Sequence, residues 1–125
     1  MEQLKARIRA EGKVRGNNEI LKVDSFLNHQ IDVALVRAIG EEFRRRFAGA
    51  EVTKILTIEA SGIGIACLAA QAFGDVPVVF AKKNRTKNIA GDVYISTVES
   101  FTQGKRPYNI FVSKEFLHPG EKVLL

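Results

Sequence analysis

A turn of small residues between two predicted secondary-structure elements could bind a phosphate. The β-branched run over residues 54–59 predicts a buried strand, the small-residue stretch over 63–73 predicts a helix, and Glu59-Ala60-Ser61-Gly62 joins them. Free N–H groups at a helix N-terminus hold phosphate or pyrophosphate, and Gly62 and Gly64 would let the backbone approach such a ligand closely. A tight turn also needs glycine for its own geometry, so this turn taken alone leaves both interpretations open.

Two lysines at the next predicted strand end could complete an anion site. Lys82 and Lys83 directly follow the apolar run over residues 76–81, which predicts a second strand. In open α/β sheets ligands bind beyond the carboxyl ends of the strands, and parallel strands place those ends along one edge. An exposed lysine pair is often ordinary solvated surface, but the position of this pair beside the glycine turn favours an anion site.

Two better-known phosphate motifs do not fit the sequence. A dinucleotide-binding fingerprint that starts at Gly62 and Gly64 has Cys67 in place of its third glycine. A Walker A loop fails because Gly104-Lys105 is followed by Arg106 rather than by serine or threonine. The phosphate-binding interpretation therefore depends on the turn and the lysine pair.

The histidines and the single cysteine indicate neither a metal site nor a nucleophile. His29 and His118 have no cysteine or acidic partner at metal-ligand spacing, so we expect no protein-only metal site. Cys67 lies among alanines and leucine, which predicts a small buried core residue, and one cysteine excludes an internal disulfide framework. No Ser-His-Asp or Cys-His arrangement emerges from the spacing, and the catalytic residues stay unknown.

The N-terminal part of the chain predicts two helices around an irregular segment. Residues 3–11 predict a short amphipathic helix that ends at Gly12. Residues 13–31 predict an irregular segment with one short strand at 19–23. A second helix begins after its N-cap, Asp32, and its apolar residues recur at spacings of three and four.

The rest of the chain predicts a parallel α/β core with a flap. A strand, a glycine turn, a helix and a strand within about thirty residues form a βαβ unit. Residues 93–101 and 108–113 predict a hairpin or flap, and Pro119-Gly120 turns the chain into a last strand that begins at Lys122.

The composition fits one globular domain with an anionic partner. The chain has 125 residues, of which 46% are hydrophobic and 26% charged, which argues against disorder, collagen and coiled coils. A net charge of +5 suggests a phosphorylated metabolite or nucleic acid as partner, but we find no recognition-helix or aromatic RNA-binding signature. The sequence has neither an apolar run long enough to span a bilayer nor a secretory signal, which predicts a cytoplasmic protein.

Three segments resemble bacterial xanthine phosphoribosyltransferases, which belong to the type I phosphoribosyltransferase family. They are LKVDSFLNHQID at 21–32, TKILTIEASGI at 53–63 and VPVVFAKK at 76–83. The first motif is the specific one, whereas the others are shared more widely by type I enzymes. VYISTVESFT and FLHPGEKVLL fit the same family, so the resemblance covers essentially the whole chain.

The resemblance implies a fold, a domain organisation and a reaction. The fold is α/β, an incomplete type I phosphoribosyltransferase fold with a parallel sheet core, an N-terminal hood and a β-flap. Residues 1–31 would form the N-terminal helix and hood, and residues 32–125 the first part of the core, with the flap at 84–107. The reaction converts xanthine and phosphoribosyl pyrophosphate, bound with Mg²⁺, to xanthosine monophosphate and pyrophosphate in purine salvage.

The resemblance also implies two groups of binding residues and a homodimer. The hood would contact the purine through Leu21 and Asn28, with Phe26 as a packing neighbour. The pyrophosphate would be held by backbone amides of the turn and by the neighbouring lysines. The residues at these positions are Ala60, Ser61, Gly62, Lys82 and Lys83. The flap would close over the site and take part in the dimer contact, and neither a membrane nor a nucleic acid is implied as a partner.

One feature of the family is missing from the sequence. The signature motif of the family is an apolar strand, two adjacent acids that hold the ribose hydroxyls, and a small-residue loop for the 5′-phosphate. The strand begins here at Lys122, and the sequence ends at Leu125 before such acids. We therefore expect the N-terminal part of such an enzyme, inactive by itself.

Two other interpretations stay open. The first is a transcriptional regulator of the same fold that senses phosphoribosyl pyrophosphate, which is disfavoured because too few residues precede the hood for a separate DNA-binding domain. The second is an orphaned fragment without activity.

Overall fold

The structure, a computed structural model, describes residues 1–17, 20–84, 91–98 and 107–125. Its helices are α1 (Glu2–Glu11), the single wide π-helical turn η1 (Asp24–Asn28), α2 (Val33–Arg46) and α3 (Ser61–Ala72). Its strands are β1 (Lys13–Arg15), β2 (Ile20–Lys22), β3 (Lys54–Ile58), β4 (Val78–Ala81), β5 (Val93–Val98), β6 (Tyr108–Ser113) and β7 (Val123–Leu124). None of the described helices is long and apolar enough to cross a membrane.

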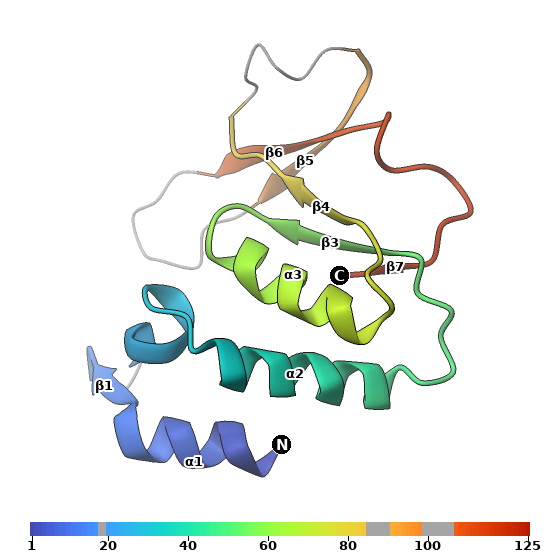
Figure 1. Ribbon diagram of the computed structural model, residues 1–125. Coiled ribbons are helices and arrows are strands. Elements are labelled where there is room, and N and C mark those ends of the chain that lie inside the picture. Colours follow the sequence, from blue (N-terminus) through green and yellow to red (C-terminus); the bar gives the residue numbers. More distant parts are fainter. Residues whose placement is uncertain (18–19, 85–90, 99–106) are drawn as a thin grey trace.

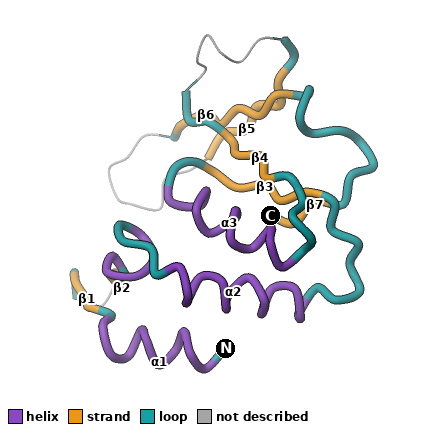
Figure 2. Tube along the Cα trace, viewed as in Figure 1, coloured by secondary structure: helices purple, strands orange, loops and turns teal. Residues whose placement is uncertain are grey.

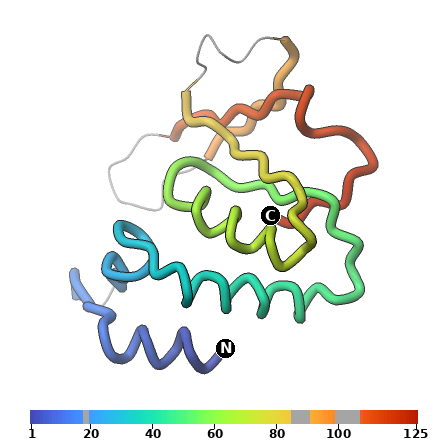
Figure 3. Tube along the Cα trace, viewed as in Figure 1, coloured from blue at the N-terminus to red at the C-terminus, as the bar shows by residue number. Residues whose placement is uncertain are grey.

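A parallel sheet in the order β4-β3-β7 forms the centre of the fold. Ile55 of β3 pairs with Val78 of β4, and Lys54 pairs with Val123 of β7. α3 connects β3 to β4 and lies with α2 on one side of the sheet (Figure 1). Figure 3 shows the C-terminal strand β7 beside β3, from the middle of the chain. The predicted βαβ unit and the α/β class are confirmed.

Small residues allow α2, α3 and the sheet to pack closely. One hydrophobic cluster contains Ile55 of β3 and three buried alanines of α3, namely Ala66, Ala69 and Ala70. Gly40 of α2 lies so near α3 that a Cβ atom there would be 2.9 Å from Ala69 Cα. The two helices therefore approach each other through small residues.

Cys67 is exposed, and its predicted place in the core is wrong. Successive residues of a helix are rotated by about 100°, so the neighbour of a buried residue turns away from its face. Ala66 occupies the buried position, and Cys67 follows it on the solvent side.

The N-terminal segment contains a hairpin where an irregular stretch with one strand was expected. The predicted helix over 3–11 is observed as α1, and the predicted strand over 19–23 as β2. β1 pairs antiparallel with β2, with Val14 opposite Leu21. Gly16 and Asn17 have φ values of 61° and 50°, which reverse the chain after β1.

A second hydrophobic cluster joins this segment to α2. Phe26 of η1 is 0% exposed and packs with Leu35 and Ile39 of α2. Leu4 and Ile8 of α1 cover the same cluster. The first helix, the hood and the start of the α/β core are therefore one packed unit.

The predicted hairpin is observed as β5 and β6, with Val93 opposite Ser113. Lys82, just after β4, forms an antiparallel bridge with Phe111 of β6, which attaches the hairpin to the parallel sheet. Figure 2 shows these strands beside β4. Most of the predicted flap at 84–107, namely 85–90 and 99–106, lies outside the described residues.

Candidate functional site

The turn between β3 and α3 leaves the start of the helix without a side-chain cap. α3 begins at Ser61, after a cis peptide bond between Glu59 and Ala60. The N-cap residue is Ala60, whose methyl group cannot accept a hydrogen bond from the first helical N–H groups. Ala60 and Ser61 are both exposed. Uncapped N–H groups at an accessible helix N-terminus suit a bound anion.

Both glycines of the turn have a steric role of their own. A Cβ atom at Gly62 would collide with Thr57 Oγ1 of the preceding strand. A Cβ atom at Gly64 would lie 2.6 Å from Ile31 Cδ1 of the hood. These close side-chain neighbours favour glycine whether or not a ligand binds, so the glycines by themselves do not decide between the two interpretations of the turn.

The ends of β3 and β4 lie side by side and bring the lysine pair to the turn. The Glu59 N–H donates to the Ala81 carbonyl oxygen at 3.1 Å. The Lys83 N–H donates to Glu59 Oε1 at 2.6 Å. Lys82 and Lys83 therefore start at the same edge of the sheet as the turn.

The two lysine side chains belong to opposite faces of the sheet. Val78 packs against the buried alanines of α3, so the alternation of side chains along β4 places Lys82 on the face that α3 covers. The Lys83 ammonium lies 5.5 Å from the centre of the Tyr108 ring in β6. Lys82 is thus the lysine on the helix side, and Lys83 contributes its backbone N–H to the turn.

Ile31 lies near the start of α3, because its Cδ1 would be 2.6 Å from a Cβ atom built at Gly64. Leu21 in β2 and Asn28 at the end of η1 are both exposed, so a ligand can reach their side chains. Phe26 is fully buried beneath them in the second cluster. The structure thus places the two predicted base-contacting residues on the outside of the hood and Phe26 inside it.

An ion-pair network that was not predicted joins α1 to Asp32, the N-cap of α2. Arg7 pairs with Asp32 at 2.6 Å and with Glu11 at 3.0 Å. The Arg7 guanidinium also lies 5.9 Å from the centre of the Phe26 ring. A hydrogen bond from the Leu35 N–H and the charge of Arg7 hold the pKa of Asp32 below its usual value. The available signal in the sequence was the spacing of Arg7 and Glu11, four apart on one helix.

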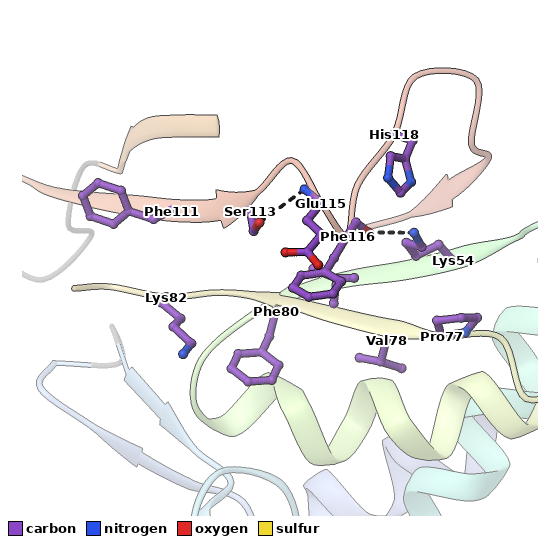
Figure 4. A pocket seen from close by; sticks show the side chains of 11 residues that line it. Lys54, Pro77, Val78, Phe80, Lys82, Phe111, Ser113, Glu115, Phe116 and His118 are labelled. Atoms are coloured by element: carbon purple, nitrogen blue, oxygen red, sulfur yellow. Dashed lines mark hydrogen bonds between the residues drawn. The ribbon is translucent and has the colours of Figure 1, made fainter. Parts of the chain in front are cut away.

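A cavity of about 580 Å³ lies beside the candidate site, between β4, β6 and residues 115–118 (Figure 4). Lys82 is among its lining residues, but residues 59–62 of the turn are not. Lys54, which is only 7% exposed, pairs there with Glu121 and donates to the Phe116 carbonyl oxygen at 2.6 Å. This lysine therefore holds the loop before β7 to the sheet.

Within the described ranges, no three histidine, cysteine, aspartate or glutamate side chains are grouped closely enough to hold a metal ion. His118 lies 3.8 Å from Glu121, but a third ligand is missing from that group.

Comparison with known proteins identifies relatives along the whole chain. A xanthine phosphoribosyltransferase of Lachnoclostridium phytofermentans is 57% identical over 125 residues, all of this chain and 63% of that protein. The one of Ruminiclostridium cellulolyticum is 58% identical over all of this chain and 64% of its own length. Along its whole length, the chain is similar to these xanthine phosphoribosyltransferases. It spans less than two thirds of the length of these curated relatives, and no family model matches it.

Solved adenine phosphoribosyltransferases share the fold of this chain. The enzyme of Giardia lamblia, complexed with 9-deazaadenine, has a TM-score of 0.69 at 24% identity, over 96% of this chain and 65% of that one. The enzyme of Saccharomyces cerevisiae has a TM-score of 0.70 at 19% identity, over 98% and 70%. The predicted partial type I phosphoribosyltransferase fold is confirmed, and none of these relatives supports the regulator alternative.

Proposed function

We propose that the protein transfers the phosphoribosyl group of phosphoribosyl pyrophosphate to xanthine, in purine salvage. The products are xanthosine monophosphate and pyrophosphate, and Mg²⁺ enters bound to phosphoribosyl pyrophosphate. The observation that carries the proposal is the identity of 54–58% to xanthine phosphoribosyltransferases over all 125 residues, which include the hood, the turn and the lysine pair.

The chemistry of this reaction fits the charges at the turn. The bond between ribose C1 and the pyrophosphate oxygen breaks while a bond between C1 and a purine nitrogen forms, so negative charge develops on the leaving pyrophosphate. The uncapped N–H groups of α3 and the nearby lysines would stabilise that charge as preorganised donors. A magnesium ion bound with the substrate would neutralise part of the same charge.

We assign the binding of the purine base and the exclusion of water to the two segments on either side of the turn. Leu21 and Asn28 would contact xanthine, one through an apolar surface and the other through amide hydrogen bonds. The flap around β5 and β6 would close over the site and exclude water, which would otherwise hydrolyse the activated sugar. The proposal includes a homodimer formed partly by this flap and a cytoplasmic location.

Calorimetric titration of a polypeptide of these 125 residues tests the two binding subsites. We expect inorganic pyrophosphate with Mg²⁺ and xanthine each to bind, and adenine to bind at least about tenfold more weakly than xanthine. Asn28→Ala should weaken xanthine binding about tenfold, because the base loses an amide partner, and should leave the affinity for pyrophosphate unchanged. Failure of both xanthine and pyrophosphate to bind would contradict the proposed function.

We expect the same polypeptide to show no xanthine-dependent release of pyrophosphate from phosphoribosyl pyrophosphate. The adjacent acids expected to hold the ribose hydroxyls after the last strand are not among its residues. A coupled pyrophosphate assay measures this, and turnover above a protein-free blank that Asn28→Ala abolishes would show the expectation to be wrong.

A further inference from the structure

We propose that Glu59 is a positioning residue that holds the backbone of the lysine pair against the pyrophosphate-binding turn. The proposal rests on the proposed function. It gives a role to a residue of the turn that has so far been assigned no contact with the pyrophosphate or the base. A carboxylate is an unexpected side chain at an anion site, because it would repel pyrophosphate unless its charge is used locally.

The side chain of Glu59 connects β3 to the residues that follow β4. Glu59 Oε1 accepts the hydrogen bond of the Lys83 N–H at 2.6 Å, and hydrogen bonds from a backbone N–H to a carboxylate are stronger than those between neutral groups. The Glu59 N–H donates to the Ala81 carbonyl oxygen at 3.1 Å. Backbone and side chain of one residue thus continue the pairing of the two parallel strands past the end of β4.

The lysine pair is held from its other side by β6. The Lys82 N–H donates to the Phe111 carbonyl oxygen, and the Phe111 N–H donates to the Lys82 carbonyl oxygen, both at 2.9 Å. Lys83 lies between this bridge and Glu59, and its ammonium lies over the Tyr108 ring. Removal of the Glu59 carboxylate would therefore release the lysine backbone on the side that faces the turn.

Lysine and arginine side chains of the described ranges form no ion pair with Glu59. The carboxylate is engaged by a backbone N–H instead, which leaves the ammonium group of Lys82 to interact with a ligand. This arrangement explains how an acid can lie next to an anion site and still favour its formation.

Two substitutions separate this role from the alternatives. Glu59→Ala removes the acceptor, whereas Glu59→Gln keeps a carbonyl oxygen at nearly the same position and removes only the charge. Titration of inorganic pyrophosphate with Mg²⁺ should give a dissociation constant about tenfold higher for Glu59→Ala and within about threefold of wild type for Glu59→Gln. Glu51→Ala, which removes an exposed acid paired with Lys122 away from the turn, is the control and should bind like wild type.

Hydrogen exchange of the Lys83 amide gives a readout without any ligand. We expect protection of this amide in wild type and in Glu59→Gln, and its loss in Glu59→Ala at an unchanged xanthine affinity. Tighter pyrophosphate binding by both variants would show that Glu59 acts only through its charge. If both variants bound pyrophosphate equally weakly and the binding no longer depended on Mg²⁺, Glu59 would be a metal ligand. Either of these results, or an unprotected Lys83 amide in wild type, overturns the proposal about Glu59. A wild-type chain that binds neither pyrophosphate nor xanthine contradicts the proposed function instead.

Discussion

At the residue scale, the packing of Gly62 on Thr57 sets the shape of the turn. A Cβ atom on Gly62 would collide with the Thr57 hydroxyl oxygen, whereas the Thr57 Cβ lies at an ordinary 3.5 Å. The strain caused by a larger residue at position 62 would therefore come from one atom of the Thr57 side chain, its hydroxyl oxygen. A double-mutant cycle can isolate that contact.

We expect Gly62→Ala to lower the free energy of unfolding by about 1–3 kcal/mol, the usual range for overpacking. Combining it with Thr57→Ala should recover most of this loss, because the atom that collides is removed. Urea unfolding of the wild type, the two single variants and the double variant measures the coupling. Additive effects of the two substitutions would show that the contact does not control the turn.

Two arginines on α2 strongly lower the pKa of Glu42. Hydrogen bonds from Arg45 and then Arg46 lower its pKa from 4.5 to about 2. Because the pKa is lowered in the folded state, the stabilisation is complete above pH 4.5 and is lost as the pH falls towards 2.

The difference in the free energy of unfolding between wild type and Glu42→Gln should therefore depend on pH. We expect wild type to be more stable above pH 4.5 and the difference to disappear as the pH approaches 2. Urea unfolding at a series of pH values measures it, with Glu41→Gln as the charge-matched control on the same helix. A difference between wild type and Glu42→Gln that does not change between these pH values would contradict the role of the arginine pair.

At the element scale, the approach of α2 to α3 depends on Gly40. A Cβ atom there would lie 2.9 Å from Ala69 Cα and 3.2 Å from the Leu68 carbonyl oxygen. Both atoms belong to the backbone of α3, so they cannot move aside as the end of a side chain can. The helices would have to separate.

We expect Gly40→Ala to destabilise the fold, although alanine favours helices by about 1 kcal/mol over glycine. The cost of separating two packed helices, about 1–3 kcal/mol, should exceed that gain. Gly49→Ala, in the turn after α2, is the steric control, because a Cβ atom at Gly49 meets nothing within 4 Å. Thermal unfolding compares the two variants, and an unfolding temperature of Gly40→Ala at or above that of wild type would show that the helices can adjust.

At the scale of the whole molecule, Phe43 joins the two hydrophobic clusters. It packs against the cluster of Ile55 and the α3 alanines, and also against the cluster of Phe26 and Leu35. The first cluster supports the turn and the second supports the hood. Phe43 on α2 therefore helps to set the relative position of the two proposed subsites.

We expect Phe43→Ala to lower the free energy of unfolding by about 2–4 kcal/mol, since it leaves a cavity between both clusters. Amide exchange in α1 and η1 should accelerate more than in β3, because the N-terminal layer loses its connection to the sheet. Phe43→Leu, which keeps most of the apolar volume, should show less than half of the effect. Equal acceleration in all three elements would show that the clusters do not separate.

The sequence alone predicted most of the elements and the meeting of the two strand ends, but neither β1 nor the π-helical turn η1. β-branched runs, small-residue helices and the N-cap at Asp32 are local patterns, and the parallel pairing of β3 with β4 follows from the short connection through α3. The anion site at the turn and the lysines was predicted from the residues, whereas the roles of Leu21 and Asn28 and the pyrophosphate ligand came from the resemblance. The relatives support the function on which those roles depend.

Only the tertiary structure decided which distant residues touch. It pairs β1 with β2, buries Lys54 against Glu121 and joins Arg7 to Asp32. It also packs Gly64 on Ile31, turns Cys67 outward and connects Glu59 to Lys83. A local pattern reports the periodicity of one segment, whereas these contacts depend on how several segments pack at once. The strand ends were therefore predictable, but the residue that holds them together was not.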